Sequence, residues 1–217
     1  MCPTIMMGFI THYLQSIRAR SFLAFVGVLL LGGAFHSTVY AEAAAPEISQ
    51  FKLEGNADGV YLSAAVSFEL TEQVQDALQK GVPVYFVAQA ELVQERWYWT
   101  DKKVATVERH LRLAYQALTR KWRLSTSSGS FVVQGLGLAL SQSFENLSDA
   151  LTAIKRVNRW HIADAADLDP NVQYHVNFKF QLDVSQLPRP LQIGVLGQAD
   201  WSLELSTRQV VTRDATR

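Results

Sequence analysis

The chain has 217 residues, 20 basic and 20 acidic side chains, and a single cysteine, Cys2. With so little cysteine, a disulfide framework and a cysteine-ligated metal site are both excluded. The formal charge of zero conceals a polarity, because eight basic and only two acidic residues lie between Arg96 and Arg123. The eight basic residues are Arg96, Lys102, Lys103, Arg109, Arg112, Arg120, Lys121 and Arg123.

Residues 1–41 have the pattern of a secretory signal peptide. Arg18 and Arg20 precede an apolar run from Phe22 to Phe35, and small residues then lead to a predicted cleavage site after Ala41. The apolar run is shorter than the roughly 20 residues that a membrane-spanning helix needs. We therefore expect a periplasmic or secreted protein without a membrane span after cleavage. The alternative is a protein that is anchored to the inner membrane by its N-terminus.

The rest of the chain divides into a linker over residues 42–47, a single β-rich domain over 48–208 and a flexible tail over 209–217. A domain of this size buries enough surface to fold without disulfides.

Most of the predicted elements are strands with one apolar face. Alternation of apolar and polar residues predicts strands around Ser49–Leu53, Val60–Leu70 and Tyr174–Leu182. Weaker patterns predict short strands at Arg159–Ile162 and from Trp201 to Leu205. The prolines of Leu187-Pro188-Arg189-Pro190 cannot donate to a sheet, which predicts an extended edge or polyproline segment there.

Two short helices interrupt the strands. The first follows Leu70, with Thr71 as its N-cap and Gly81 just beyond its C-terminus. The second has apolar residues at helical spacing from Phe144 to Ile154, with Ser143 as its N-cap.

A long hairpin from Gly81 to Leu124 organises the chain. Phe86, Ala88, Ala90 and Leu92 share one apolar face, and Leu111, Leu113, Tyr115 and Ala117 share one face of the returning strand. Opposed residues of a hairpin lie on the same face. A tight loop centred on Asp101-Lys102 then predicts that Leu92 pairs with Leu111 and that Glu91 lies opposite Arg112.

These elements predict a mainly β fold: an antiparallel β-sandwich, immunoglobulin-like in the loose sense, with two short helices. The alternative is an α+β fold in which one curved antiparallel sheet carries both helices on its apolar face. Periodicity does not separate the two.

Several short motifs resemble those of DUF4390, a family of uncharacterised exported bacterial proteins. They are Gly81-Val82-Pro83-Val84-Tyr85-Phe86, Arg96-Trp97-Tyr98-Trp99, Tyr115-Gln116-Ala117-Leu118-Thr119-Arg120, Leu182-Asp183 and the proline segment at 187–190. The resemblance implies export and supplies no catalytic residues. It also implies a neighbouring gene for an envelope sensor kinase, whose periplasmic domain becomes a candidate partner.

The residues that could support catalysis or metal binding do not form a recognisable motif. His110 and His175 fall on strand faces that we expect to be wet, and His161 follows Trp160 on a weak strand. None has a second histidine at metal-ligand spacing, so we predict no metal, no cofactor and no catalytic site. The alternative is an enzyme of unknown class with a site near residues 160–169.

We expect a non-enzymatic interaction module of the cell envelope that uses the basic aromatic hairpin. The predicted binding residues are Arg96, Trp97, Trp99, Lys102, Lys103, Arg109, Arg112, Lys121 and Arg123. Their partner would be an acidic envelope protein or anionic headgroups, and the leader argues against nucleic acid. A further alternative is a hydrophobic-ligand carrier, which a cavity of more than roughly 300 Å³ lined by strand residues would favour.

Overall fold

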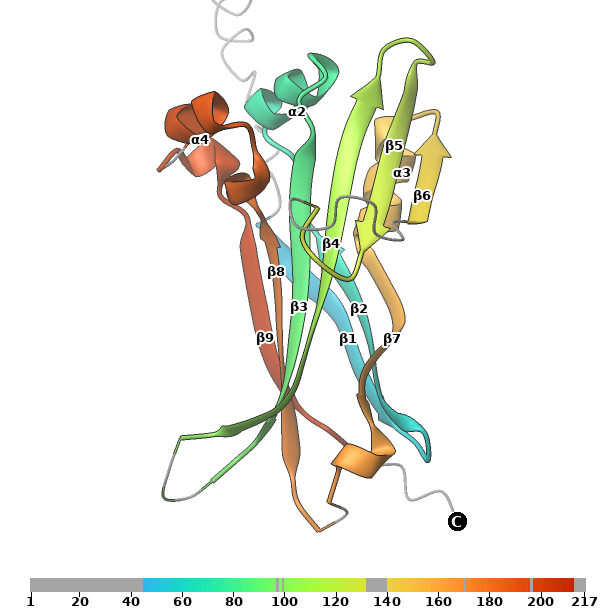
Figure 1. Ribbon diagram of the computed structural model, residues 1–217, viewed down its shortest axis with the longest axis vertical. Coiled ribbons are helices and arrows are strands. Elements are labelled where there is room, and N and C mark those ends of the chain that lie inside the picture. Colours follow the sequence, from blue (N-terminus) through green and yellow to red (C-terminus); the bar gives the residue numbers. More distant parts are fainter. Residues whose placement is uncertain are drawn as a thin grey trace, which may run out of the picture. The chain divides into compact units, whose positions relative to one another are not determined.

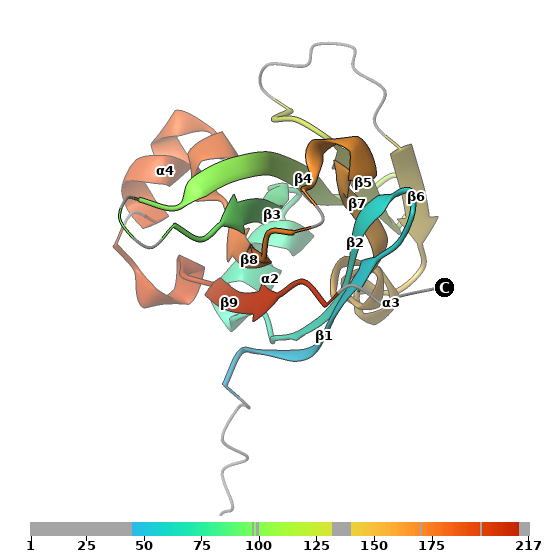
Figure 2. The same cartoon turned by 90° about the horizontal axis from the view of Figure 1, so that it is seen from below.

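The computed structural model describes residues 45–96, 98, 100–131, 140–169, 171–195 and 197–212. In this part of the chain the protein is mainly β and contains two antiparallel sheets, one of three strands and one of six. Figures 1 and 2 show the sheets as two layers, with strands from the two halves of the chain in each. The predicted β-sandwich fits this arrangement.

The three-stranded sheet, sheet A, has the order β1-β2-β7. Its strands are β1 (Glu47–Gly55), β2 (Gly59–Ser67) and β7 (Arg156–Asp164). The turn between β1 and β2 is fixed by Asn56, whose side-chain oxygen accepts hydrogen bonds from the backbone N–H groups of Asp58 and Gly59, each at 3.0 Å. The weak strand predicted at 159–162 is thus part of a longer strand, β7.

The six-stranded sheet, sheet B, has the order β6-β5-β4-β3-β8-β9. Its strands are β3 (Val84–Gln94), β4 (Lys102–Gln116), β5 (Lys121–Ser127), β6 (Leu140–Phe144), β8 (Tyr174–Leu182) and β9 (Glu204–Val210). Strand β9 begins later than predicted and continues past residue 208, and the backbone N–H of Val211 still bonds to the carbonyl of Tyr174 at 2.9 Å. The predicted hairpin is the β3–β4 pair.

Three α-helices are described: α2 (Glu72–Gln79), α3 (Leu147–Ile154) and α4 (Arg189–Val195). Helix α2 has the predicted ends, because the Thr71 hydroxyl accepts from the N–H of Val74 at 3.4 Å and Gly81 has a φ of 86°. Short 3₁₀ turns occupy residues 165–167, 184–186 and 199–201. No helix in the described ranges is long and apolar enough to cross a membrane.

Two predictions about the helices are wrong. Helix α3 begins after Asn146 rather than Ser143, because Phe144 belongs to β6 and pairs with Trp122. The segment with Pro188 and Pro190 does not stay extended but starts α4. A proline fits the first turn of a helix, where its missing N–H would have no partner in the helix anyway.

The core lies between the inner faces of the two sheets. Phe68, Phe86, Phe178 and Phe180 are almost fully buried there, and the rings of Phe86 and Phe180 stack at 5.9 Å. Phe51 of sheet A contacts Phe178 of sheet B at a ring distance of 5.8 Å. Burial of such side chains stabilises each by about 1.5–3 kcal/mol, so these contacts hold the layers together.

The β3–β4 register differs from the prediction by six residues. Phe86, not Leu92, lies opposite Leu111, and Leu92 lies opposite Ala105. Faces are preserved, because an even shift keeps every side chain on its side of the sheet. Glu108 consequently lies opposite Gln89 and not opposite Glu95, which avoids a like-charge pair. Glu91 forms its ion pair with Lys103, at 2.7 Å, instead of with Arg112.

Candidate interaction surface

Strand β4 carries cations on both of its faces. Successive side chains of a strand point to opposite sides. Arg109 lies opposite Ala88, which is buried in the core, whereas Arg112 lies opposite Tyr85, two positions from Val87 on the outer face. The predicted binding residues therefore cannot form one surface.

Arg109 belongs to the inner side of the sandwich. Its guanidinium carbon lies 4.9 Å from the centre of the Trp160 ring in sheet A, and the side chain is half-buried. Burial lowers the pKa of Arg109, since the charged form loses contact with water. Arg109, one of the predicted binding residues, therefore lies on the opposite side of sheet B from Arg112.

Three cations share the outer face of sheet B at the β4–β5 end: Arg112, Lys121 and Arg123. We call them the basic face. In the register of β4 and β5, Arg123 lies opposite Ala114 and Lys121 opposite Gln116, so Arg123 is the diagonal neighbour of Arg112 and lies between it and Lys121. Among the described residues, neither arginine has a carboxylate oxygen within 4.0 Å. Lys121 lies 3.9 Å from Glu145, a largely exposed side chain.

Serine hydroxyls lie beside the basic face on β5 and β6, where Ser125 is buried and Ser141 and Ser143 are exposed. Ser125 lies opposite Arg112, Ser143 lies opposite Arg123, and the hydroxyls of Ser125 and Ser141 are 3.0 Å apart. Strand β6 ends the order of sheet B, so its outer edge faces none of the described strands. Cations with interleaved hydroxyls are suited to binding carboxylates, because both groups donate hydrogen bonds to an anionic oxygen.

The other predicted cations lie at the far end of the hairpin. Arg96 and Lys102 are exposed near the β3–β4 tip, and Lys103 pairs with Glu91. A strand rises about 3.3 Å per residue, which places Lys103 roughly 30 Å from Arg112 along β4. Figure 1 shows the β3–β4 tip and the β4–β5 turn at opposite ends of the sheet.

The tip also contains acidic groups, which are bound to sheet B. Arg208 of β9 contacts the carboxylates of Glu95 and Asp101, each at 3.1 Å. His175 of β8 lies 3.9 Å from Glu95. These ion pairs reduce the positive field at the tip, so the basic face is the stronger candidate for an anionic partner.

The aromatic part of the predicted site is only partly placed. Trp97 and Trp99 lie outside the described residues, and Tyr98 between them is 64% exposed. Trp122 is buried against the core, its ring 4.8 Å from that of Tyr115. The aromatic side chain beside the basic face is thus a core residue and not a contact residue.

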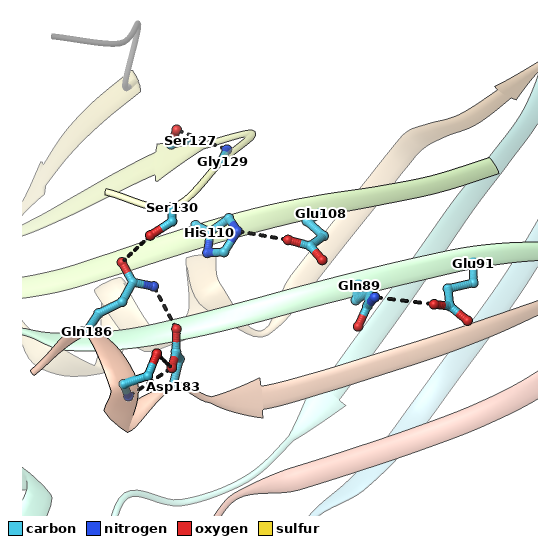
Figure 3. Close-up of polar contacts among 10 residues, drawn as sticks. Gln89, Glu91, Glu108, His110, Ser127, Gly129, Ser130, Asp183 and Gln186 are labelled. Atoms are coloured by element: carbon cyan, nitrogen blue, oxygen red, sulfur yellow. Dashed lines mark hydrogen bonds and ion pairs between the residues drawn. The ribbon is translucent and has the colours of Figure 1, made fainter. Parts of the chain in front are cut away.

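Two histidines expected on wet faces are largely buried. His110 lies 3.1 Å from Glu108 and opposite Ser127, next to a turn in which Ser130 contacts Gln186 (Figure 3). Its Nδ1 atom has no hydrogen-bond partner among the described residues. The contact with Glu108 orients the ring.

The region proposed for the alternative enzyme site holds one histidine–carboxylate pair. His161 lies 3.3 Å from Asp164, is substantially exposed and packs near the Tyr61 ring at 5.2 Å. Asp164 ends β7, and Asp167 is in the 3₁₀ turn that follows. Within the described part of the chain no group of three or more metal-ligating side chains converges.

One family model matches the chain. It is described as a domain of unknown function, DUF4390, and it covers residues 43–211. No curated protein matches. No solved structure matches either.

Proposed function

Because the chain belongs to the DUF4390 family, whose description assigns no chemistry, we propose a function from the geometry of the site. The protein acts as an exported, non-enzymatic interaction module of the cell envelope. It binds an acidic protein surface through the basic face.

One observation carries this proposal: Arg112 and Arg123 are adjacent on an outer sheet face and have no described carboxylate partner. Exposed cations on proteins are commonly screened or paired, and an unpaired cluster steers anionic partners toward it. The charge of the rest of the chain also supports an acidic partner for the basic face, because the chain outside Arg96–Arg123 is acidic overall. A partner with clustered carboxylates would therefore be oriented as well as attracted.

The shape of the site favours a protein over a lipid surface. The cations lie along a strand face with serines between them, and the edge strand β6 lies directly beside them. Extended protein segments often bind at such an edge by adding a strand. The periplasmic domain of an envelope sensor kinase is one candidate partner.

Photo-crosslinking in intact cells tests the proposal. A photoreactive amino acid at Ser143 lies on the exposed part of the basic face and should give an adduct with an acidic protein. Reversal of charge at Arg112→Glu and Arg123→Glu should remove that adduct. The control double variant, Lys80→Glu with Arg189→Glu, changes the net charge equally at two exposed positions, just after α2 and at the start of α4, and should keep the adduct.

Two outcomes would contradict the proposal. One is an adduct that survives the Arg112→Glu, Arg123→Glu change but is lost in the control. The other is binding of purified protein to anionic phospholipid vesicles that depends on Arg112 and Arg123, with no protein adduct in cells. That result would assign the basic face to lipid headgroups.

A further inference from the structure

A cleft lies on the inner side of sheet B, away from the basic face. Sheet A has only three strands, and the inner faces of β5 and β6 are opposed by α3 and the start of β7 (Figure 2). The space between them has a volume of about 380 Å³. This lies within the range of about 300–1,000 Å³ that is typical of small-molecule sites.

The walls of this cleft are largely apolar. Leu111 and Leu124 come from sheet B, and Ile154 and Val157 come from α3 and β7; all four are buried. Leu140 of β6 also lines the cleft and is 77% exposed. A hydrocarbon chain in the cleft would lie along these side chains.

Two arginines line the same cleft. Arg109 is half-buried and Arg156, the first residue of β7, is exposed. Among the described residues neither guanidinium has a carboxylate within 4.0 Å. Arg109 instead lies over the Trp160 ring, and desolvation alone lowers its pKa. A partly buried cation without a counter-charge is unfavourable, and a bound anion would relieve this.

We propose that the cleft binds a single-chain anionic amphiphile. The alkyl chain lies against Leu111, Leu124 and Ile154, and the anionic head accepts hydrogen bonds from Arg109 and Arg156. One chain rather than two is favoured because the volume is near the lower end of the usual range. The site is independent of the proposed function, since Arg109 and Arg112 lie on opposite faces of sheet B.

Two sources could supply this chemistry: a free long-chain fatty acid, with a carboxylate head, and a lysophospholipid, with a phosphodiester head. Both present anionic oxygens that arginine binds with two parallel hydrogen bonds. The probes are therefore dodecanoate and a lysophosphatidylglycerol of the same chain length, each below its critical micelle concentration.

Isothermal titration calorimetry of the purified exported protein measures the binding. We expect one molecule of probe per chain. Affinity should rise about fourfold for each methylene from octanoate to dodecanoate, as apolar burial predicts. Dodecanol, which lacks the charge, should bind about tenfold more weakly or worse. The probe that binds more tightly identifies the source. If neither probe binds, the proposal is overturned.

Three variants and a control locate the site. Arg109→Gln and Arg156→Gln should each weaken dodecanoate binding, by about tenfold at Arg109, because each removes a charge-assisted hydrogen bond. Ala153→Trp should abolish binding by filling the cleft, which Ala153 lines. Arg112→Gln, on the opposite face of the same sheet, should leave the affinity within twofold.

The proposal is overturned if Ala153→Trp binds dodecanoate like the parent protein, or if both arginine variants keep the parent affinity. If Arg109→Gln fails to fold, Arg156→Gln decides the role of charge, because Arg156 is exposed and its replacement leaves the core intact.

Discussion

Arg109 and Arg112 are three residues apart on β4, yet they lie on opposite faces of sheet B: Arg109 contacts Trp160 inside the sandwich and Arg112 belongs to the outer basic face. The cations that are clustered in the sequence therefore lie in three separate places: inside the sandwich, on the basic face and at the β3–β4 tip. Each arginine is a natural control for the other, because the two share a strand and a charge but not a surface.

Charge reversal on the basic face should affect binding and not folding. We expect Arg112→Glu with Arg123→Glu to change the free energy of unfolding by no more than about 1 kcal/mol for each site. Arg123 is exposed, Arg112 is half-buried, and neither forms an ion pair with a described residue, so their charges contribute little to stability. Partner binding of the parent protein should weaken with rising salt, and the variant should lose that dependence. Urea unfolding and binding at two salt concentrations measure both effects. A large loss of stability would show that these arginines are structural.

Gly59 should not tolerate a side chain. A Cβ atom at Gly59 would lie 2.1 Å from the backbone oxygen of Ala163, and its φ of 155° is one that other residues rarely adopt. We expect Gly59→Ala to lower the free energy of unfolding by at least about 2 kcal/mol. Gly194→Ala is the control, because the added Cβ meets nothing within 4 Å and alanine favours the helix by about 0.5–1 kcal/mol. Equal stability of the two variants would contradict the close β2–β7 pairing at Gly59.

The two N-caps should contribute unequally. Thr71 accepts from the N–H of Val74 and donates to the carbonyl of Asp200 at 2.9 Å, whereas Asn146 makes no side-chain capping bond to α3. We expect Thr71→Ala to cost about 1 kcal/mol and Asn146→Ala less than about 0.5 kcal/mol. Denaturant unfolding of the two variants under the same conditions tests this order, and the reverse order would refute it.

Engineered disulfides report the hairpin register directly. In a Cys2→Ser background the pair Gln89→Cys and Glu108→Cys should form a disulfide, because directly opposed residues place their Cβ atoms about 4.5–5.5 Å apart. Gln89→Cys with Ala114→Cys, which would be opposed in the register predicted from the sequence, should stay reduced. Non-reducing electrophoresis after oxidation separates the two results, and cross-linking of only the second pair would restore the predicted register.

The strand faces were predictable from sequence, and the register was not. Alternation in Phe86, Ala88, Ala90 and Leu92 identifies the buried side of β3, but any even shift of β4 preserves that pattern. At the tip, Glu95 and Asp101 are held by ion pairs with Arg208, which lies more than a hundred residues away in the sequence. Such long-range ion pairs have no local signal.

The candidate site was predictable as a charge cluster but not as a surface. Arg109, Arg112 and Arg123 are close in sequence, and parity along β4 already separates the first two. Arg123 joins Arg112 only through the β4–β5 register. The cleft at Arg109 and Arg156 requires β4 and β7 to be opposed, and no spacing along the chain indicates that.

Export should be visible in the mature protein. We expect its N-terminus between Glu42 and Pro46, as the leader pattern predicts. Intact-mass spectrometry of protein from the periplasmic fraction measures it. If the protein were cytosolic and retained Met1 or Met6, the envelope location in the proposed function would be wrong.

The most direct test compares Arg109→Gln and Arg112→Glu in both assays. If the basic face and the cleft are independent sites, each variant should affect only one assay. Arg112→Glu should lower the crosslinking yield from Ser143 and leave dodecanoate affinity within twofold. Arg109→Gln should weaken dodecanoate binding and leave the crosslinking yield unchanged. Loss of both activities in both variants, with each still folded, would contradict two independent sites on opposite faces of β4.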